Sequence, residues 1–275
     1  MRPWCLFLPF LPEIVALTSH DRRAFLTSAV LVGRSSIANA ADLLLEPGLL
    51  DARVSENLLN PPPYGMEAND ISYPSWLAGV WTVESTTQDV LAPCGVTLFG
   101  GNATYQNARK DIGTALRYES RFVQQGTVVV ADRAFNVQSI AKAAIGPNSV
   151  VDIPRATPNQ LSCILAPPGA PSLLQADLLT LNRRQEVVSD SQFDCSEVVR
   201  EIVAPVGQRA SPSLLKEIET ISLYTLHDDG RVTCRQRSAA FLLPSQQNPM
   251  AQKLWEASQG RAVDVRYYDL VYQKR

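Results

Sequence analysis

The sequence is poor in the residue types that catalysis and metal binding use most often. Its 275 residues contain only two histidines, His20 and His227. It holds no Cys-x-x-Cys pair, phosphate-binding loop or dinucleotide fingerprint. His227 adjoins the Asp228-Asp229-Gly230 turn, so a catalytic dyad would have to be built at the tip of a hairpin. We therefore predict no catalytic residue, no metal site and no cofactor.

Basic excess and long apolar runs are also missing. The formal net charge is −2, and it becomes more negative without residues 1–40, which carry four arginines against two acidic residues. Such a chain cannot neutralise a phosphate backbone, which argues against nucleic-acid binding. No later run approaches the roughly 18 apolar residues that a membrane span requires, so we expect no transmembrane segment in the mature chain.

The first 40 residues have the three parts of a targeting signal. Residues 22–26 (RRAFL) match the twin-arginine pattern, residues 29–32 are apolar, and residues 36–40 (SIANA) offer a small-x-small cleavage site. In a bacterium this signal would lead to the periplasm; in a plant or alga it indicates the chloroplast thylakoid lumen, which is the address we expect. Residues 1–21 lack the composition of a plastid transit peptide, so whether they are the true N-terminus stays open.

The mature chain divides into a leader and one domain. Residues 41–72 hold Pro47 and the run of prolines at 61–63 with little periodicity, which predicts a flexible leader. Residues 73–275 read as a single domain, because 45% hydrophobic and 19% charged content can bury a full core.

From residue 79 on, alternating patterns and turn residues predict nine or ten antiparallel strands. Asp229-Gly230 is the strongest hairpin signal. Two short helices are expected, one with Asn136 as its N-cap and one that begins at Asn248-Pro249. The strands fall at residues 80–87, 114–124, 126–132, 149–153, 161–165, 176–188, 193–203, 217–226, 231–242 and 262–273.

These elements lack a βαβ rhythm and predict an all-β fold, a single antiparallel up-and-down β-barrel; the alternative is a β-sandwich. Gly79-Val80-Trp81 resembles the start of lipocalin-like (calycin-like) barrels, where the tryptophan plugs the barrel floor. That resemblance implies a basic residue of the last strand against the tryptophan. Arg266 is the candidate for this cation–π partner of Trp81.

Four blocks carry a second resemblance: residues 73–76 (YPSW), 130–136 (VADRAFN), 229–237 (DGRVTCRQR) and 263–269 (VDVRYYD). Together they look like an uncharacterised thylakoid-lumen domain family of plants and algae, over most of residues 73–275. The resemblance implies the lumenal address and a single domain. It implies no catalytic residue, because that family has no established activity.

Strand alternation supplies candidate ligand-binding residues. Arg231, Arg235 and Arg237 share one strand face, which is either a solvated outer face or the wall of a wet cavity. Asp132 and Arg133 are either cavity residues or a salt bridge at the end of a strand. Under the cavity interpretation the candidates are Trp81, Glu119, Asp132, Arg133, Arg235, Arg237, Arg266 and Tyr268.

Four cysteines, Cys94, Cys163, Cys195 and Cys234, remain after residue 40 and allow three disulfide connectivities, between which the sequence does not choose. Cys163 and Cys234 fit buried strand positions. Cys94, between Pro93 and Gly95, is the candidate for a reactive or bridged thiol.

Two functions are compatible with these patterns. The first is a non-enzymatic lumenal protein that binds an apolar small molecule (a pigment, quinone or lipid) or assists the assembly of photosynthetic complex subunits. The alternative is a lumenal isomerase or de-epoxidase-like enzyme acting on a carotenoid or lipid. It requires a deep pocket where Asp132 or Glu119 converges with Tyr268 or Arg237.

Overall fold

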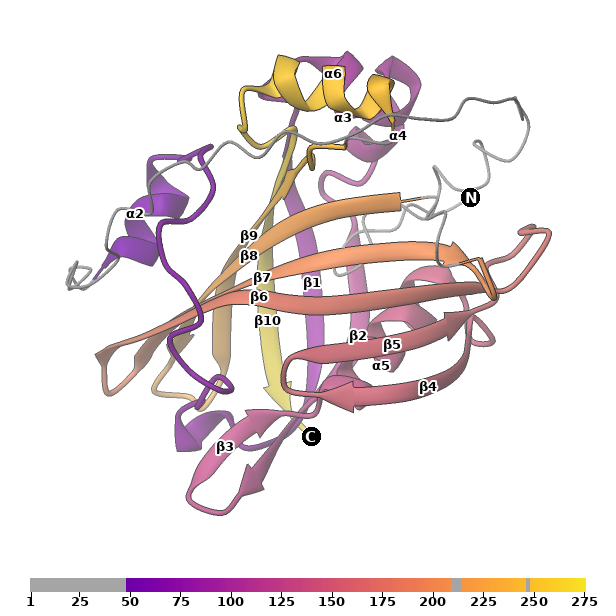
Figure 1. Ribbon diagram of the computed structural model, residues 1–275. Coiled ribbons are helices and arrows are strands. Elements are labelled where there is room, and N and C mark those ends of the chain that lie inside the picture. Colours follow the sequence, from indigo (N-terminus) through magenta and orange to yellow (C-terminus); the bar gives the residue numbers. More distant parts are fainter. Residues whose placement is uncertain (1–47, 209–213, 246–247) are drawn as a thin grey trace.

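The computed structural model describes residues 48–208, 214–245 and 248–275. The predicted targeting signal and residues 41–47 lie outside this range. One ten-stranded antiparallel sheet curls into an open half-barrel, with several short helices around it (Figure 1). The strands are β1 (Gly79–Leu91), β2 (Ala115–Gln125), β3 (Val128–Ala131), β4 (Val150–Thr157), β5 (Gln160–Leu165), β6 (Leu174–Ser189), β7 (Gln192–Pro205), β8 (Leu214–Leu226), β9 (Val232–Phe241) and β10 (Asp264–Lys274).

The strand order is that of an up-and-down barrel opened at one place. The order β3-β2-β1-β10-β9-β8-β7-β6-β5-β4 pairs each strand with its neighbour in sequence and also pairs β1 with β10. β3 and β4 are the two edge strands of this sheet. Pairing between them would close the barrel, but they are not paired with each other. The predicted antiparallel up-and-down order is confirmed, and the predicted barrel is confirmed only as an open half-barrel, because β3 and β4 do not close it. The β-sandwich alternative is wrong.

Helix α5 (Arg133–Ile145) explains why the circle stays open. It connects β3 to β4 and packs against β2. Asn136 of this helix accepts from the backbone N–H of Arg121 at 2.7 Å and donates to its carbonyl at 3.1 Å, while Ser139 accepts from the N–H of Glu119 at 2.8 Å. These side chains satisfy an edge of β2 that would otherwise pair with another strand.

The predicted helices are both present, with one difference at an end. Asn248 caps α6 (Pro249–Ser258) by accepting from two backbone N–H groups, as expected. The N-cap of α5 is Asp132 and not Asn136, because Asp132 Oδ1 accepts from the N–H of Phe135. The sequence did not predict α2 (Leu49–Ser55), η1 (Ser75–Leu77), α3 (Val96–Phe99) or α4 (Asn102–Arg109). Among the described helices, none has the length and apolarity needed to cross a bilayer.

In residues 48–72, the described part of the predicted flexible leader, helix α2 packs against the outer face of the sheet. Leu50 of α2 is fully buried against Ile221 and Leu223 of β8. Arg53 reaches Glu219 of the same strand at 2.9 Å. The leader has little hydrophobic periodicity, so these contacts could not be predicted from its sequence.

Trp81 is buried in the largest core cluster, on the inner face of the sheet. Its Nε1 donates to the carbonyl of Leu77 at 2.7 Å. The predicted contact with Arg266 is wrong, because the register places Lys274 opposite Trp81 and its Nζ lies 5.5 Å from the indole centroid. Arg266 lies opposite Val90, eight residues back along β10, and its guanidinium lies 5.6 Å from the ring centroid of Phe99.

Candidate functional site

The inner face of the half-barrel encloses a cavity of about 140 Å³. The sheet forms most of its wall, α5 covers one side, and Ile71 of the leader and Tyr73 at the start of the domain close another. Side chains alternate between the two faces of each strand, and many of those that point inward are apolar. Its apolar lining includes Ile140, Leu161, Leu178, Val199, Ile218 and Tyr224.

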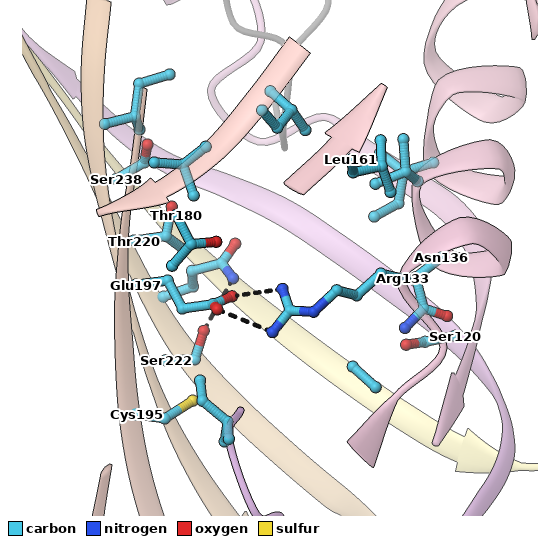
Figure 2. A pocket seen from close by; sticks show the side chains of 18 of the residues that line it. Ser120, Arg133, Asn136, Leu161, Thr180, Cys195, Glu197, Thr220, Ser222 and Ser238 are labelled. Atoms are coloured by element: carbon cyan, nitrogen blue, oxygen red, sulfur yellow. Dashed lines mark hydrogen bonds and ion pairs between the residues drawn. The ribbon is translucent and has the colours of Figure 1, made fainter. Parts of the chain in front are cut away.

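A belt of neutral polar side chains crosses this apolar wall. Figure 2 shows Thr180, Thr220, Ser222 and Ser238 projecting from the sheet, and Ser120 on the opposite side. Thr220 of β8 and Ser238 of β9 are direct register partners. Gln236 donates to Ser222 at 3.0 Å. The belt offers hydroxyl groups that can both donate and accept hydrogen bonds.

One ion pair spans the cavity from α5 to the sheet. Arg133 donates to both carboxylate oxygens of Glu197, at 2.9 and 3.0 Å (Figure 2). It also donates to Asp70 at 2.6 Å. Arg183 donates to the same Glu197 carboxylate at 2.7 Å. Burial alone would raise the pKa of Glu197, but its interactions with Arg133 and Arg183 outweigh burial and lower the pKa. Glu197 is therefore an ionised, fully engaged carboxylate.

Glu201 lies on the same face of β7 as Glu197, but it differs in its hydrogen bonding and protonation. It lines the cavity and is 1% exposed, and its Oε2 has no hydrogen-bond partner within the described part of the chain. Burial raises the pKa of this carboxyl to about 8, although the charge of Lys216, its register partner on β8, acts in the opposite direction. At neutral pH Glu201 is therefore mainly a neutral acid that faces the cavity.

Of the residues predicted from sequence to be in the cavity, Arg133 and Tyr268 line it. Burial raises the pKa of Tyr268 well above its usual range, so it is a neutral phenol. Glu119 is instead ion-paired with Arg275 in a largely exposed position. Asp132 caps α5 and forms a strand-end salt bridge at 2.6 Å, but its partner is Arg121 and not Arg133.

The arginine row of β9 lies on the outer face, as alternation requires once Gln236 and Ser238 point inward. Arg235 is largely exposed and pairs with Asp51 at 2.7 Å. Arg237 is fully buried beneath the leader, where it donates to Glu219 at 3.0 Å and to the Leu58 carbonyl.

The remaining candidates also lie away from the cavity lining. Arg266 forms a buried pair with Asp264 at 2.8 Å, and Trp81 lies in the core. Glu197 and Glu201 were not among the sequence candidates. The alternation of residues 195–201 could have placed both on one face, but nothing in the sequence marked that face as the inner one.

The cysteines in the described ranges, Cys94, Cys163, Cys195 and Cys234, are free thiols. Cys195 lines the cavity, and burial raises its pKa well above the usual value. Cys94 is half-buried, with its Sγ 3.4 Å from the Ala262 carbonyl. No group of three or more His, Cys, Asp and Glu side chains in the described residues is arranged to hold a metal ion.

Of three comparisons with known proteins, one gives a match. No curated protein and no solved structure matches the chain. A family described as a domain of unknown function (DUF6816) matches residues 65–274, a span that includes all ten strands but not α2. The chain therefore belongs to the DUF6816 family.

Proposed function

We propose that the protein binds a small, mainly apolar molecule with at least one polar atom in the cavity of the half-barrel. The observation that carries this proposal is the composition of the wall, where apolar side chains surround a belt of hydroxyl groups. Ligand sites typically combine an apolar surface with a few polar groups that orient the ligand.

The volume limits the size of the bound group. A protein cavity of about 150 Å³ lined by aliphatic and aromatic side chains accommodates benzene. The cavity here, at about 140 Å³, suits one six-membered ring. A pigment, quinone or lipid would therefore place a ring or head group inside, with any long chain outside.

The thylakoid lumen is the proposed location. This address rests on residues 22–40, which lie outside the described residues. Replacing both Arg22 and Arg23 with Lys should block delivery of a tagged chain to the lumen, because the twin-arginine route reads that pair. Unchanged delivery of the double variant would contradict the address. Participation in the assembly of photosynthetic complexes is a further proposal for the same location.

The isomerase or de-epoxidase alternative requires a carboxyl group and a Tyr or Arg that converge on a substrate. Glu119 and Asp132, named for that role, lie outside the cavity lining and are paired with Arg275 and Arg121. Glu201 does line the cavity, but it was not one of the residues named for that role. The two carboxyl groups named for catalysis are therefore not in the cavity, and binding remains the function proposed.

Two measurements test binding. Native mass spectrometry of the protein purified from its own thylakoids should detect a bound small molecule, and toluene should bind the ligand-free protein in calorimetric titration. Thr220→Leu, which adds volume to the cavity wall, should weaken toluene binding. Thr225→Leu is the matched control, since Thr225 lies on the same strand but on the opposite face. If toluene fails to bind the wild type, or binds both variants equally, the proposal is wrong.

A further inference from the structure

We infer that Glu201 anchors the ligand: its carboxylic acid donates a hydrogen bond to an acceptor oxygen, such as a ketone or quinone carbonyl, on a ring bound in the cavity. This inference rests on the proposed binding function and adds to it the chemical class of the ligand. It also assigns a role to the buried Oε2 of Glu201, which has no hydrogen-bond partner within the described part of the fold.

The first argument is the contrast between the two acidic residues of the lining. Glu197 and Glu201 share one face of β7 and lie about 13 Å apart along the strand. Glu197 is held by Arg133 and Arg183. Glu201 is at least as buried, yet its Oε2 has no partner among the described residues. A buried polar atom without a hydrogen bond is rare, because it loses its hydration without replacement.

The second argument is what surrounds this carboxyl. In register it lies beside Leu178 of β6, and Val199 and Ile218 line the same cavity. Such a wall contacts a hydrocarbon ring well. A ring whose carbonyl points to Glu201 would contact these apolar side chains and give the buried acid a hydrogen-bond acceptor, while the hydroxyl belt remains available to other polar atoms of the ligand.

The third argument is charge. Besides Glu201, the charged residues of the described lining are Arg133 on α5 and Glu197 on the same strand, and Lys216 on β8 is the register partner of Glu201. A cationic ligand would lie near Lys216 and Arg133. An anionic ligand would lose its hydration in a largely apolar cavity where the lining cation, Arg133, is already paired with Glu197 and Asp70. A neutral acceptor is therefore the class that this arrangement favours.

The arrangement makes binding dependent on pH. A protonated carboxyl donates a hydrogen bond, whereas the carboxylate can only accept one. Burial places the pKa of Glu201 at about 8, with Lys216 opposing the shift. The affinity for an acceptor ligand should be constant below that pH and should fall above it, by up to about tenfold per pH unit.

Two probes of similar shape test the inference. Acetophenone carries a carbonyl acceptor, and toluene carries no polar atom. In the wild-type protein, acetophenone should bind more weakly at pH 9 than at pH 7, while toluene binding should change little. Glu201→Gln retains a neutral donor, so it should keep acetophenone binding and lose the pH dependence.

Glu201→Leu removes the donor and keeps a similar volume. It should weaken acetophenone binding roughly three- to tenfold, as expected for one lost hydrogen bond, and leave or improve toluene binding. Thermal unfolding of each variant at both pH values checks that the folded protein is compared. If acetophenone binds independently of pH and Glu201→Leu does not weaken it, Glu201 meets only water and the inference fails, while toluene binding still supports the cavity. If neither probe binds the wild type, the proposed function itself fails.

Discussion

Charged side chains on the outer face of the sheet are buried together beneath the leader. Glu219 is fully buried and accepts from Arg53 at 2.9 Å, from Arg237 at 3.0 Å and from the Tyr64 hydroxyl at 2.7 Å. Arg237 also donates to the carbonyl of Leu58. One carboxylate thus compensates two guanidinium groups that would be costly to bury alone.

Removing that carboxylate should destabilise the protein strongly. Glu219→Ala leaves Arg53 and Arg237 buried without a counter-charge, which should lower the free energy of unfolding by about 3–5 kcal/mol in urea denaturation. Glu84→Ala is the control, because Glu84 pairs with the exposed Arg117 and should change stability by less than about 1 kcal/mol. Equal effects of the two substitutions would show that the buried network is not needed.

Glu201 should give the protein a pH-dependent stability even without ligand. Burial raises the pKa of its carboxyl from 4.5 to about 8. Between these values the folded state holds a proton that the unfolded state releases, so the stabilisation is complete below pH 4.5 and falls as the pH rises to 8. The slope from this group is at most about 1.4 kcal/mol per pH unit. Denaturant unfolding from pH 5 to 9 should show a shallower decline for Glu201→Gln, and parallel curves would contradict the raised pKa.

At the scale of single elements, α5 determines whether the sheet closes. Its side chains satisfy backbone groups of β2 through Asn136 and Ser139, and its first residue, Arg133, reaches across the cavity to Glu197. Helix α5 therefore occupies the free edge of β2, covers one side of the cavity and contributes the lining residue Arg133. This combination links the open architecture directly to the candidate site.

The N-cap of α5 can be tested by a pair of substitutions at Asp132. Its Oδ1 accepts from the N–H of Phe135, and its Oδ2 pairs with the half-exposed Arg121. Asp132→Ala removes both contacts and should lower the free energy of unfolding by about 1 kcal/mol. Asp132→Asn keeps the cap and loses only the ion pair, so it should cost clearly less. Similar losses for Ala and Asn would mean that the cap contributes little.

At the scale of the whole molecule, the half-barrel has two edges of unequal protection. β3 is short, and α5 covers the part of β2 beyond it. β4 pairs with β5 on one side, most of its residues are exposed, and Pro154 interrupts its hydrogen-bonding groups. Proline and exposure are typical of an edge strand.

Hydrogen exchange should reveal this asymmetry. In exchange measured by mass spectrometry, amides of β4 (Val150–Thr157) should exchange well before those of β7 (Gln192–Pro205), which is paired on both sides. Edge strands open with fewer broken contacts than central ones. Protection of β4 equal to that of β7 would indicate a covering or a closing partner for this edge.

Much of the strand architecture could be read from local patterns. Turns at Gln125-Gly126 and Asp229-Gly230 lie between paired strands, and alternation correctly separated Arg235 and Arg237 from Gln236. The pattern did not indicate which face was inner. The candidate site was therefore predicted only in part: Arg133 and Tyr268 line the cavity, whereas Glu201 was missed.

The sequence alone determined the local choices: which segments become strands, where hairpins turn, and the all-β antiparallel class. These follow from side-chain periodicity and turn chemistry, which act over a few residues. Only the tertiary structure decided that β3 and β4 stay apart, that the leader covers Arg237, and that Glu201 faces a cavity without a charged contact of the kind that holds Glu197. Those outcomes depend on burial and on contacts between residues distant in sequence, and no short pattern encodes either.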